Sequence, residues 1–261
     1  MAIQSPDYFK LDGVSSEQYG LYVDTPPMPP MAVQKTSSND FYLNHEDMVT
    51  RRDYFKNIDV TLKCYFFDIP NNINALYSWL LTGKKLETSR FDDFYYKIKA
   101  VKSIKVSYKG SNIYVLNITF TCSPYRYKLD STISFVWGDS AIKNGVEISN
   151  AGSIPAFPII DIYVTDGNKL LMPEQNDAAV TEQYGNYFYV NNNKFGFLIF
   201  KTNLPLHIYV DCYNKITYDS NGKILLTFGA YPVLKQGKNK LETKGKYLGN
   251  TITIDTQERY I

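Results

Sequence analysis

The sequence has few of the side chains on which most enzymes and metal proteins depend. Its 261 residues include only two His, three Cys and two Trp. Cys64, Cys122 and Cys212 are odd in number and have no CxxC spacing, which predicts buried, reduced thiols and neither a disulfide framework nor a zinc site. No nucleophile, phosphate-binding or metalloprotease motif accompanies His45 or His207. We therefore predict that the chain is not an enzyme and uses no cofactor.

Net charge and long apolar runs are also lacking. The chain has 28 basic and 26 acidic side chains, whereas a general nucleic-acid binder has a strongly basic domain. The longest apolar stretches, such as Phe197–Phe200, are far shorter than the roughly 20 residues that span a bilayer. The first residues show no basic segment followed by an apolar one. We expect no sequence-specific nucleic acid, no membrane and no secretion signal.

Tyrosine is the residue that the sequence has in excess. There are 23 Tyr and 15 Phe, and aromatic side chains favour pleated sheets, so we predict a mainly β fold. Residues 58–66 alternate strictly between apolar and polar, which indicates a half-buried strand. Residues 71–83 have helical spacing, with Asn to cap the start and Gly83 for the left-handed position after the end. Residues 96–108 and 112–122 predict two further strands around a turn.

These elements predict an N-terminal α+β domain, residues 1–130, in which one helix packs on a β-sheet or barrel. Pro124 is expected to end the last strand, because proline interrupts ladder pairing. A proline-rich extension occupies residues 25–50, and its four prolines between Pro26 and Pro30 favour extended, polyproline-like backbone. It is either a stiff surface connection or the base of an extension that contacts a neighbouring subunit.

Residues 131–261 show no helical periodicity and predict a C-terminal β-sandwich. Short apolar alternations are separated by turn sequences rich in Asn, Asp and Gly, a spacing typical of two packed sheets. The expected strands are 159–164, 187–190, 195–200, 206–210, 215–218, 223–228 and 251–254, with turns at 166–168, 191–193, 219–222 and 236–239.

One segment combines many lysines with no acidic side chain. Between Asp93 and Asp130 there are seven basic residues and no Asp or Glu. Alternate residues of a strand point to opposite faces, so odd-numbered lysines are expected to lie opposite an even-numbered apolar set. This predicts either a solvated face with partners elsewhere or a surface that meets an acidic protein or a polyanion. The candidates are Lys97, Lys99, Lys105 and Lys109, opposite Ile98, Ala100, Ile104, Val106 and Tyr108.

The order of landmarks along the whole chain resembles the distal tail proteins (Dit) of long-tailed, non-contractile bacteriophages. In the first half the resemblance rests on Phe9–Gly13, Tyr19–Val23, Arg51–Phe55, Tyr77–Gly83, Phe94–Ile98 and Phe120–Tyr125. In the second half it rests on Asn150–Ser153, Ala156–Ile160, Ile208–Asp211 and Tyr231–Asn239, which is similar to the P-x-L-x-x-G-x-N stretch of the galectin-like half of the family.

The resemblance implies a structural virion protein of the phage tail tip, made in the bacterial host cytoplasm. Its N-terminal halves are expected to form a hexameric hub ring that joins the tail tube protein to the tail-tip protein, with receptor-binding or baseplate proteins as further partners. The ring leaves a channel for DNA ejection, and galectin-like sandwiches decorate its outside. Residues 131–261 leave no room for the arm insertion of longer relatives. With one His, one Arg and Trp137 they imply no lectin site.

Two other functions stay open from the residues alone. A carbohydrate-binding adhesin is favoured by a β-sandwich with many tyrosines, which can stack on sugar rings. A cell-wall hydrolase needs a pair of carboxylates, for which the candidates are Asp211, Asp219, Asp255 and Glu258.

Overall fold

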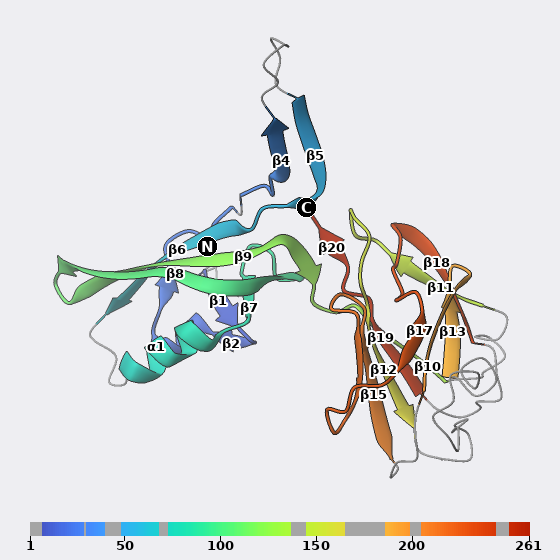
Figure 1. The fold of residues 1–261 in the computed structure, drawn as a ribbon. Helices are drawn as coiled ribbons and strands as arrows, with labels where there is room; N and C mark the ends of the chain where they lie inside the picture. Colours follow the sequence, from blue (N-terminus) through green and yellow to red (C-terminus); the bar gives the residue numbers. More distant parts are fainter. Residues whose placement is uncertain are drawn as a thin grey trace, which may run out of the picture. The chain divides into compact units, whose positions relative to one another are not determined.

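The computed structural model divides into two compact units, and the boundary in the sequence falls between residues 129 and 130. It describes residues 7–28, 30–39, 48–67, 73–136, 145–164, 186–198, 205–243 and 251–261. In these ranges the chain is mainly antiparallel β-sheet with one α-helix, which confirms the predicted fold class (Figure 1). The described N-terminal sheet is open and does not close into a barrel.

The N-terminal unit is built on a sheet with the strand order β2-β1-β7-β8-β9-β6-β3. Strand β6 (Ile58–Phe67) pairs with β9 (Ile113–Lys128), which pairs on its other side with β8 (Phe94–Gly110). The tight turn between β8 and β9 has Ser111 and Asn112 at positive φ. The shorter elements are β1 (Phe9–Leu11), β2 (Val14–Ser15), the 3-10 helix η1 (Ser16–Tyr19), β3 (Tyr22–Val23) and β7 (Lys85–Thr88).

Helix α1 (Ile73–Thr82) covers one face of this sheet (Figure 1). Its side chains Leu76 and Leu80 are buried in one apolar cluster with the inward-facing residues of β6 and β9. The predicted helix is confirmed, and its expected Asn cap lies outside the described residues. The prediction for Gly83 is wrong, because this glycine does not adopt a positive φ. A Cβ there would lie 2.9 Å from Cδ1 of Leu11, so close packing explains the glycine.

Strand β9 passes through Pro124, which contradicts the prediction that proline ends it. Tyr96 of β8 pairs with Arg126, but Ile98 pairs with Cys122, so three residues of β9 face a single residue of β8. The proline falls in this bulge, where the ladder is interrupted and a missing N–H costs little.

The segment after the proline-rich stretch forms a hairpin. Strands β4 (Gln34–Asn39) and β5 (Met48–Phe55) pair with each other, and within the described chain they pair with no other strand. The extension therefore continues as β-sheet after the proline-rich residues, whose described part forms no strand. The ring of Phe55 meets that of Tyr125 at 6.0 Å between centroids, where the hairpin joins the sheet.

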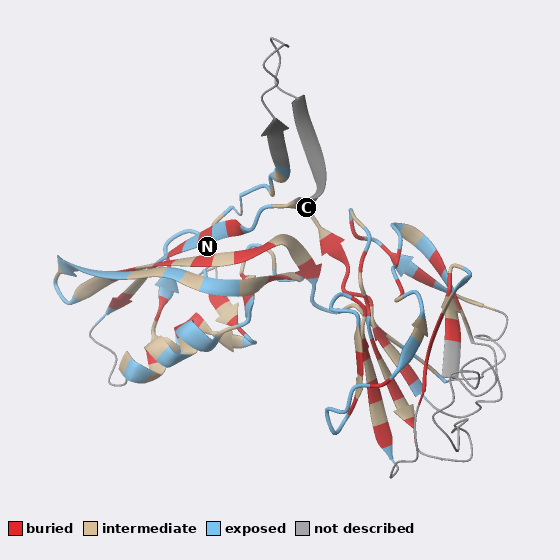
Figure 2. Cartoon of the chain, in the orientation of Figure 1, coloured by how far each residue is buried: buried red, intermediate tan, exposed pale blue. Residues whose placement is uncertain are grey.

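The C-terminal unit is a sandwich of two five-stranded antiparallel sheets that share one apolar core. Figure 2 shows buried residues alternating with less buried ones along its strands. The first sheet has the order β10-β19-β12-β15-β16 and the second β11-β18-β13-β14-β17. The strands of the two sheets are β10 (Thr132–Val136), β11 (Val146–Asn150), β12 (Ile159–Val164), β13 (Asn186–Val190), β14 (Asn193–Phe197), β15 (Leu206–Asp211), β16 (Ile216–Asp219), β17 (Thr227–Gly229), β18 (Gly237–Thr243) and β19 (Thr251–Asp255). The short strand β20 (Arg259–Tyr260) belongs to neither of them.

Most predicted strands of this unit are confirmed, and β10, β11 and β18 are additional. The turn predicted at 236–239 is wrong in part, since β18 begins at Gly237. The turn at 219–222 is confirmed, and its Asp219 carboxylate accepts hydrogen bonds from the backbone N–H groups of Asn221 and Lys223. The turn predicted at 166–168 lies outside the described residues.

The three cysteines are free and buried, as predicted. Burial raises the pKa of the Cys64 and Cys122 thiols to about 12, so both stay protonated at neutral pH. Burial raises the pKa of Cys212 as well. Thiols of this kind are poor nucleophiles, because the reactive form is the thiolate.

Two buried asparagines fasten the loops of the sandwich. The amide of Asn239 donates to the carbonyls of Lys235 and Gly237, while its oxygen accepts from the Lys235 N–H and the Asn191 amide. Asn150 donates to the carbonyls of Ile154 and Leu234. Both residues belong to the stretches that carry the family resemblance, and their observed roles are structural.

We expect Asn239→Ala to lower the free energy of unfolding by about 1–3 kcal/mol, because it leaves the N–H and carbonyl groups of Lys235, whose bonds to Asn239 are partly buried, without these partners. Exposed Asn193 is the matched control, and Asn193→Ala should change stability by less than about 0.5 kcal/mol. Urea unfolding followed by circular dichroism measures both. Equal stability of the two variants would contradict the fastening role.

Candidate interaction surface of the N-terminal sheet

The face of the N-terminal sheet that points away from helix α1 is polar and carries the candidate lysines. Along β6 this face presents Asp59, Thr61 and Lys63, while the intervening residues are buried beneath the helix. Their register partners on β9 are Thr121, Thr119 and Asn117. The strict alternation recognised in the sequence therefore fixes this part of the surface.

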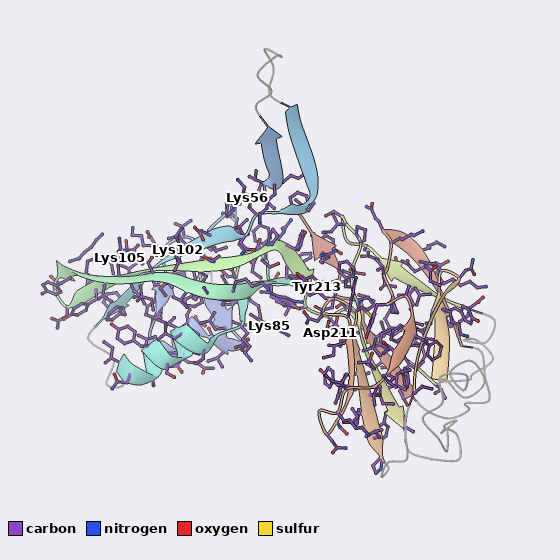
Figure 3. The ribbon with its side chains drawn as sticks, in the orientation of Figure 1. Lys56, Lys85, Lys102, Lys105, Asp211 and Tyr213 are labelled. Atoms are coloured by element: carbon purple, nitrogen blue, oxygen red, sulfur yellow. The ribbon has the colours of Figure 1, made fainter. Side chains whose placement is uncertain are left out.

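Strand β8 adds lysines to the same face. Lys105 pairs with Asn117, which in turn pairs with Lys63 of β6, so the three side chains form a row across the strands. Figure 3 shows Lys102 and Lys105 on the side of the sheet opposite α1. The Nζ atom of Lys109 lies 5.5 Å from the ring centroid of Tyr65. We call Lys63, Lys102, Lys105 and Lys109 the lysine face.

The expected alternation along β8 is interrupted between Ile98 and Ile104. The register of β8 on β9 shifts between Tyr96 and Ile98, Ile98 and Ala100, Val101 and Ser103, and Tyr108 and Gly110. The one-residue bulges after Ile98 and Val101 each exchange the faces of the following residues, so the second restores the expected alternation from Ile104. Lys102 consequently belongs to the lysine face despite its even number. Ala100 pairs with Thr121 on the polar face, which contradicts its predicted place. Val106 and Tyr108 pair with Leu116 and Tyr114 on the apolar face, as predicted, although both are exposed.

The remaining two candidates differ from each other. The ammonium of Lys97 lies 4.0 Å above the ring of Tyr127, and its stem is half-buried, as is common for lysine over an aromatic surface. Lys99 is exposed. Of the four predicted lysines, the structure thus places only Lys105 and Lys109 in the lysine face.

Two aspartates neutralise part of the lysine face. Lys63 Nζ donates to Asp24 at 2.7 Å, and Lys102 donates to Asp59, which also accepts from the Thr121 hydroxyl at 2.8 Å. The bond from Lys102 holds the pKa of Asp59 below its usual range, and the bond from Lys63 does the same for Asp24. Both pairs are solvent-exposed, so they orient side chains more than they stabilise the fold.

The sheet that carries this face has two open edges. β7 pairs with β8 only from Tyr95 to Lys97, so in the described chain the outer edge of β8 from Lys99 to Gly110 has no strand beside it. At the opposite side, β3 pairs with β6 only at Cys64 and Tyr65. Unpaired strand edges are templates for pairing with another chain, and lysines are common on edges that must avoid uncontrolled pairing.

Within the described ranges, the candidate carboxylates make hydrogen bonds to turns and loops. Asp211, Asp219, Asp255 and Glu258 each accept hydrogen bonds from their own turn or a nearby loop. His45 lies outside the described residues, and His207 pairs with Asp161. Where side chains are described, no group of three or more His, Cys, Asp or Glu residues could hold a metal ion. No described helix is long and apolar enough to cross a membrane.

Comparison with solved structures shows a likeness of fold. The chain is similar to the crystal structure of the SPP1 Dit (gp 19.1) protein, described as a paradigm of the hub adsorption apparatus in phages that infect Gram-positive bacteria. The TM-score is 0.61 at 11% sequence identity, and the match covers 98% of this chain and 100% of the other. No family model and no curated protein matches the sequence. The likeness shows a Dit-like fold.

We expect Lys102→Gln to raise the pKa of Asp59 toward the ordinary value of an aspartate, because the charged partner is lost. Since the folded-state pKa is depressed, the contribution of the pair to stability is present at neutral pH and is lost as pH falls through the folded-state pKa. Carboxyl NMR titration measures the shift. Lys105→Gln is the control and should leave Asp59 unchanged; an equal effect of both variants would contradict the assignment of the pair.

Proposed function

We propose that this chain is a structural protein of a bacteriophage tail tip, acting as a distal tail protein that joins the tail tube to the tail-tip proteins. The observation that carries the proposal is the likeness of fold to the SPP1 Dit hub protein over 98% of this chain. The order of sequence landmarks supports the same conclusion. In this proposal the protein belongs to the virion and acts by assembly, without catalysis.

Six copies form the hub ring through their N-terminal units. The open edges of β8 and β6 lie at opposite sides of one sheet, so β8 of one copy can pair with β6 of the next. Each such contact is head-to-tail, and a series of them closes into a ring when the rotation per copy divides a full turn. Closure also removes the edges that would otherwise promote aggregation.

The lysine face meets a polyanion or an acidic partner in the assembled tip. DNA that passes through the ring during ejection is one such polyanion, and lysines attract its phosphates without reading sequence. Asp24 and Asp59 already pair with Lys63 and Lys102, which leaves Lys105 and Lys109 as the main source of net positive charge on this face. A weak attraction of this kind allows DNA to move.

The C-terminal sandwich is the galectin-like domain of the proposed hub. The part of it that the structure describes carries no long arm, so receptor-binding or baseplate proteins dock on the surface of the sandwich itself or on the tail-tip protein. The docking of these partners is part of the proposed function.

We expect engineered disulfides between the two open edges to link neighbouring copies covalently, giving a series of oligomers from the dimer up to the hexamer and none larger. Thr61→Cys on β6 is combined in turn with Ser103→Cys, Lys105→Cys or Ser107→Cys on β8, to scan the register between copies. Within one copy β9 separates the two positions by about 9.6 Å, which is too far for a disulfide. Non-reducing electrophoresis measures the size of the covalent oligomers, and negative-stain microscopy should show six-fold rings with an open lumen.

The natural thiols do not interfere with this experiment, because all three are buried and their pKa values are raised. Each single cysteine variant is a control and should give dimers at most. A monomer in every combination, with no rings beside tail partners, would overturn the ring proposal.

We expect charge reversal on the exposed lysines to block tail assembly or DNA ejection while the melting temperature stays nearly unchanged. The test variant replaces Lys99, Lys105 and Lys109 by Glu and spares Lys97, which packs on Tyr127. The control makes the same charge change in the C-terminal unit, at exposed Lys215, Lys223 and Lys235. Infectivity and particle morphology are the readouts. Normal virions from the test variant would return these lysines to the role of an ordinary solvated face.

A further inference from the structure

The outward face of one sheet of the C-terminal sandwich carries a continuous strip of aromatic rings. Tyr163 of β12 lies 4.5 Å from His207 of β15, measured between ring centroids. His207 lies 6.0 Å from Tyr209 on the same strand, and Tyr209 lies 5.3 Å from Tyr218 of β16. We call these four residues the aromatic strip.

The register of the sheet places these rings together. Tyr163 pairs with His207, and Tyr209 pairs with Tyr218, while the alternate residues Ile162 and Ile208 are buried in the core. The strip is therefore built on strands that the apolar core holds rigidly. Binding sites on strands are positioned more accurately than sites on loops.

Hydrogen-bonding groups border the rings. Nδ1 of His207 lies 2.9 Å from the Asp161 carboxylate, and these side chains are 41% and 32% exposed. Thr251 pairs with Tyr163 and Thr253 with Asp161, which adds two hydroxyls to the same face. Desolvation and the nearby Asp161 charge raise the pKa of Tyr209, so its hydroxyl stays protonated and can donate.

The two sheets of the sandwich differ in charge. On the described strands of the aromatic sheet no outward residue is Lys or Arg. The second sheet carries Lys194, Lys238 and Lys240 instead, with Lys238 paired to Glu147 at 2.9 Å. An anionic polymer would therefore find no positive partner on the aromatic strip. The charge distribution favours a neutral ligand.

We propose that the aromatic strip binds a neutral carbohydrate chain, with sugar rings stacked on the tyrosines and hydroxyls bonded to Asp161, His207 and the phenols. Tyrosine suits such a ligand because it combines an apolar ring with a polar tip. Binding sites for small molecules join aromatic lining with a few placed polar groups in the same way. The core of a protein–protein interface is predominantly apolar. On this face the outward aliphatic residues Ile159, Ile216 and Val136 lie at the ends of their strands, and the centre is occupied by the aromatic strip.

The full-length protein is applied to an array of neutral hexose and N-acetylhexosamine oligosaccharides together with anionic cell-wall polymers, and the best neutral oligosaccharide is titrated by calorimetry. We expect saturable binding to neutral members, weakened roughly tenfold by Tyr209→Ala and by Tyr218→Ala. Tyr213→Ala is the matched control, because Tyr213 lies in the β15–β16 turn, is 63% exposed and is outside the strip (Figure 3). It should keep the affinity within about twofold.

Three outcomes overturn the proposal: no saturable binding to any neutral oligosaccharide, binding to anionic polymers alone, or binding that survives both strip substitutions. Circular dichroism melting verifies that each variant is folded. If the strip variants instead lose a protein partner while no sugar binds, the face is a protein interface and the carbohydrate assignment is wrong. The result does not depend on ring assembly, since rings can form whether or not the C-terminal unit binds sugar.

Discussion

The pairing of β6 with β9 is the constraint on which the N-terminal unit depends. Ten consecutive register pairs, from Ile58 opposite Cys122 to Phe67 opposite Ile113, run without a bulge. Because side chains alternate with a period of two, this ladder assigns every residue of both strands to one of two faces. One face is apolar and accepts helix α1, and the other is polar. A slip by one residue would exchange the faces, so burial of the apolar set fixes the register.

Strand β8 departs from this regularity, and its departures produce the features of functional interest. Its bulges bring Lys102 to the polar face and accommodate Pro124 in the neighbouring strand. Beyond Lys97 its outer edge has no partner strand in the described part of the chain. The same strand thus combines an edge available for assembly with lysines that limit unspecific pairing.

The C-terminal unit shows how a sandwich can keep one core and still present two different surfaces. The inner residues of both sheets form one apolar cluster, and buried Asn150 and Asn239 satisfy the backbone groups of the loops. Outward positions are free of this packing requirement. One sheet uses them for paired charges such as Lys238 with Glu147, and the other uses them for aromatic rings such as Tyr209.

The sequence by itself determined those features that depend on local periodicity and composition. The strand at 58–66, the helix at 73–82, the mainly β fold and the burial of the three thiols follow from alternation, helical spacing and the absence of cysteine pairs. Half of the candidate surface follows as well, because β6 alternates without interruption. The tertiary structure decided the rest. Bulges in β8 depend on its partner strand, so no period in the sequence shows that Lys102 replaces Lys97 on the lysine face. The aromatic strip joins three strands that are adjacent only after folding, because cross-strand register, and not sequence distance, brings Tyr163, His207 and Tyr218 together.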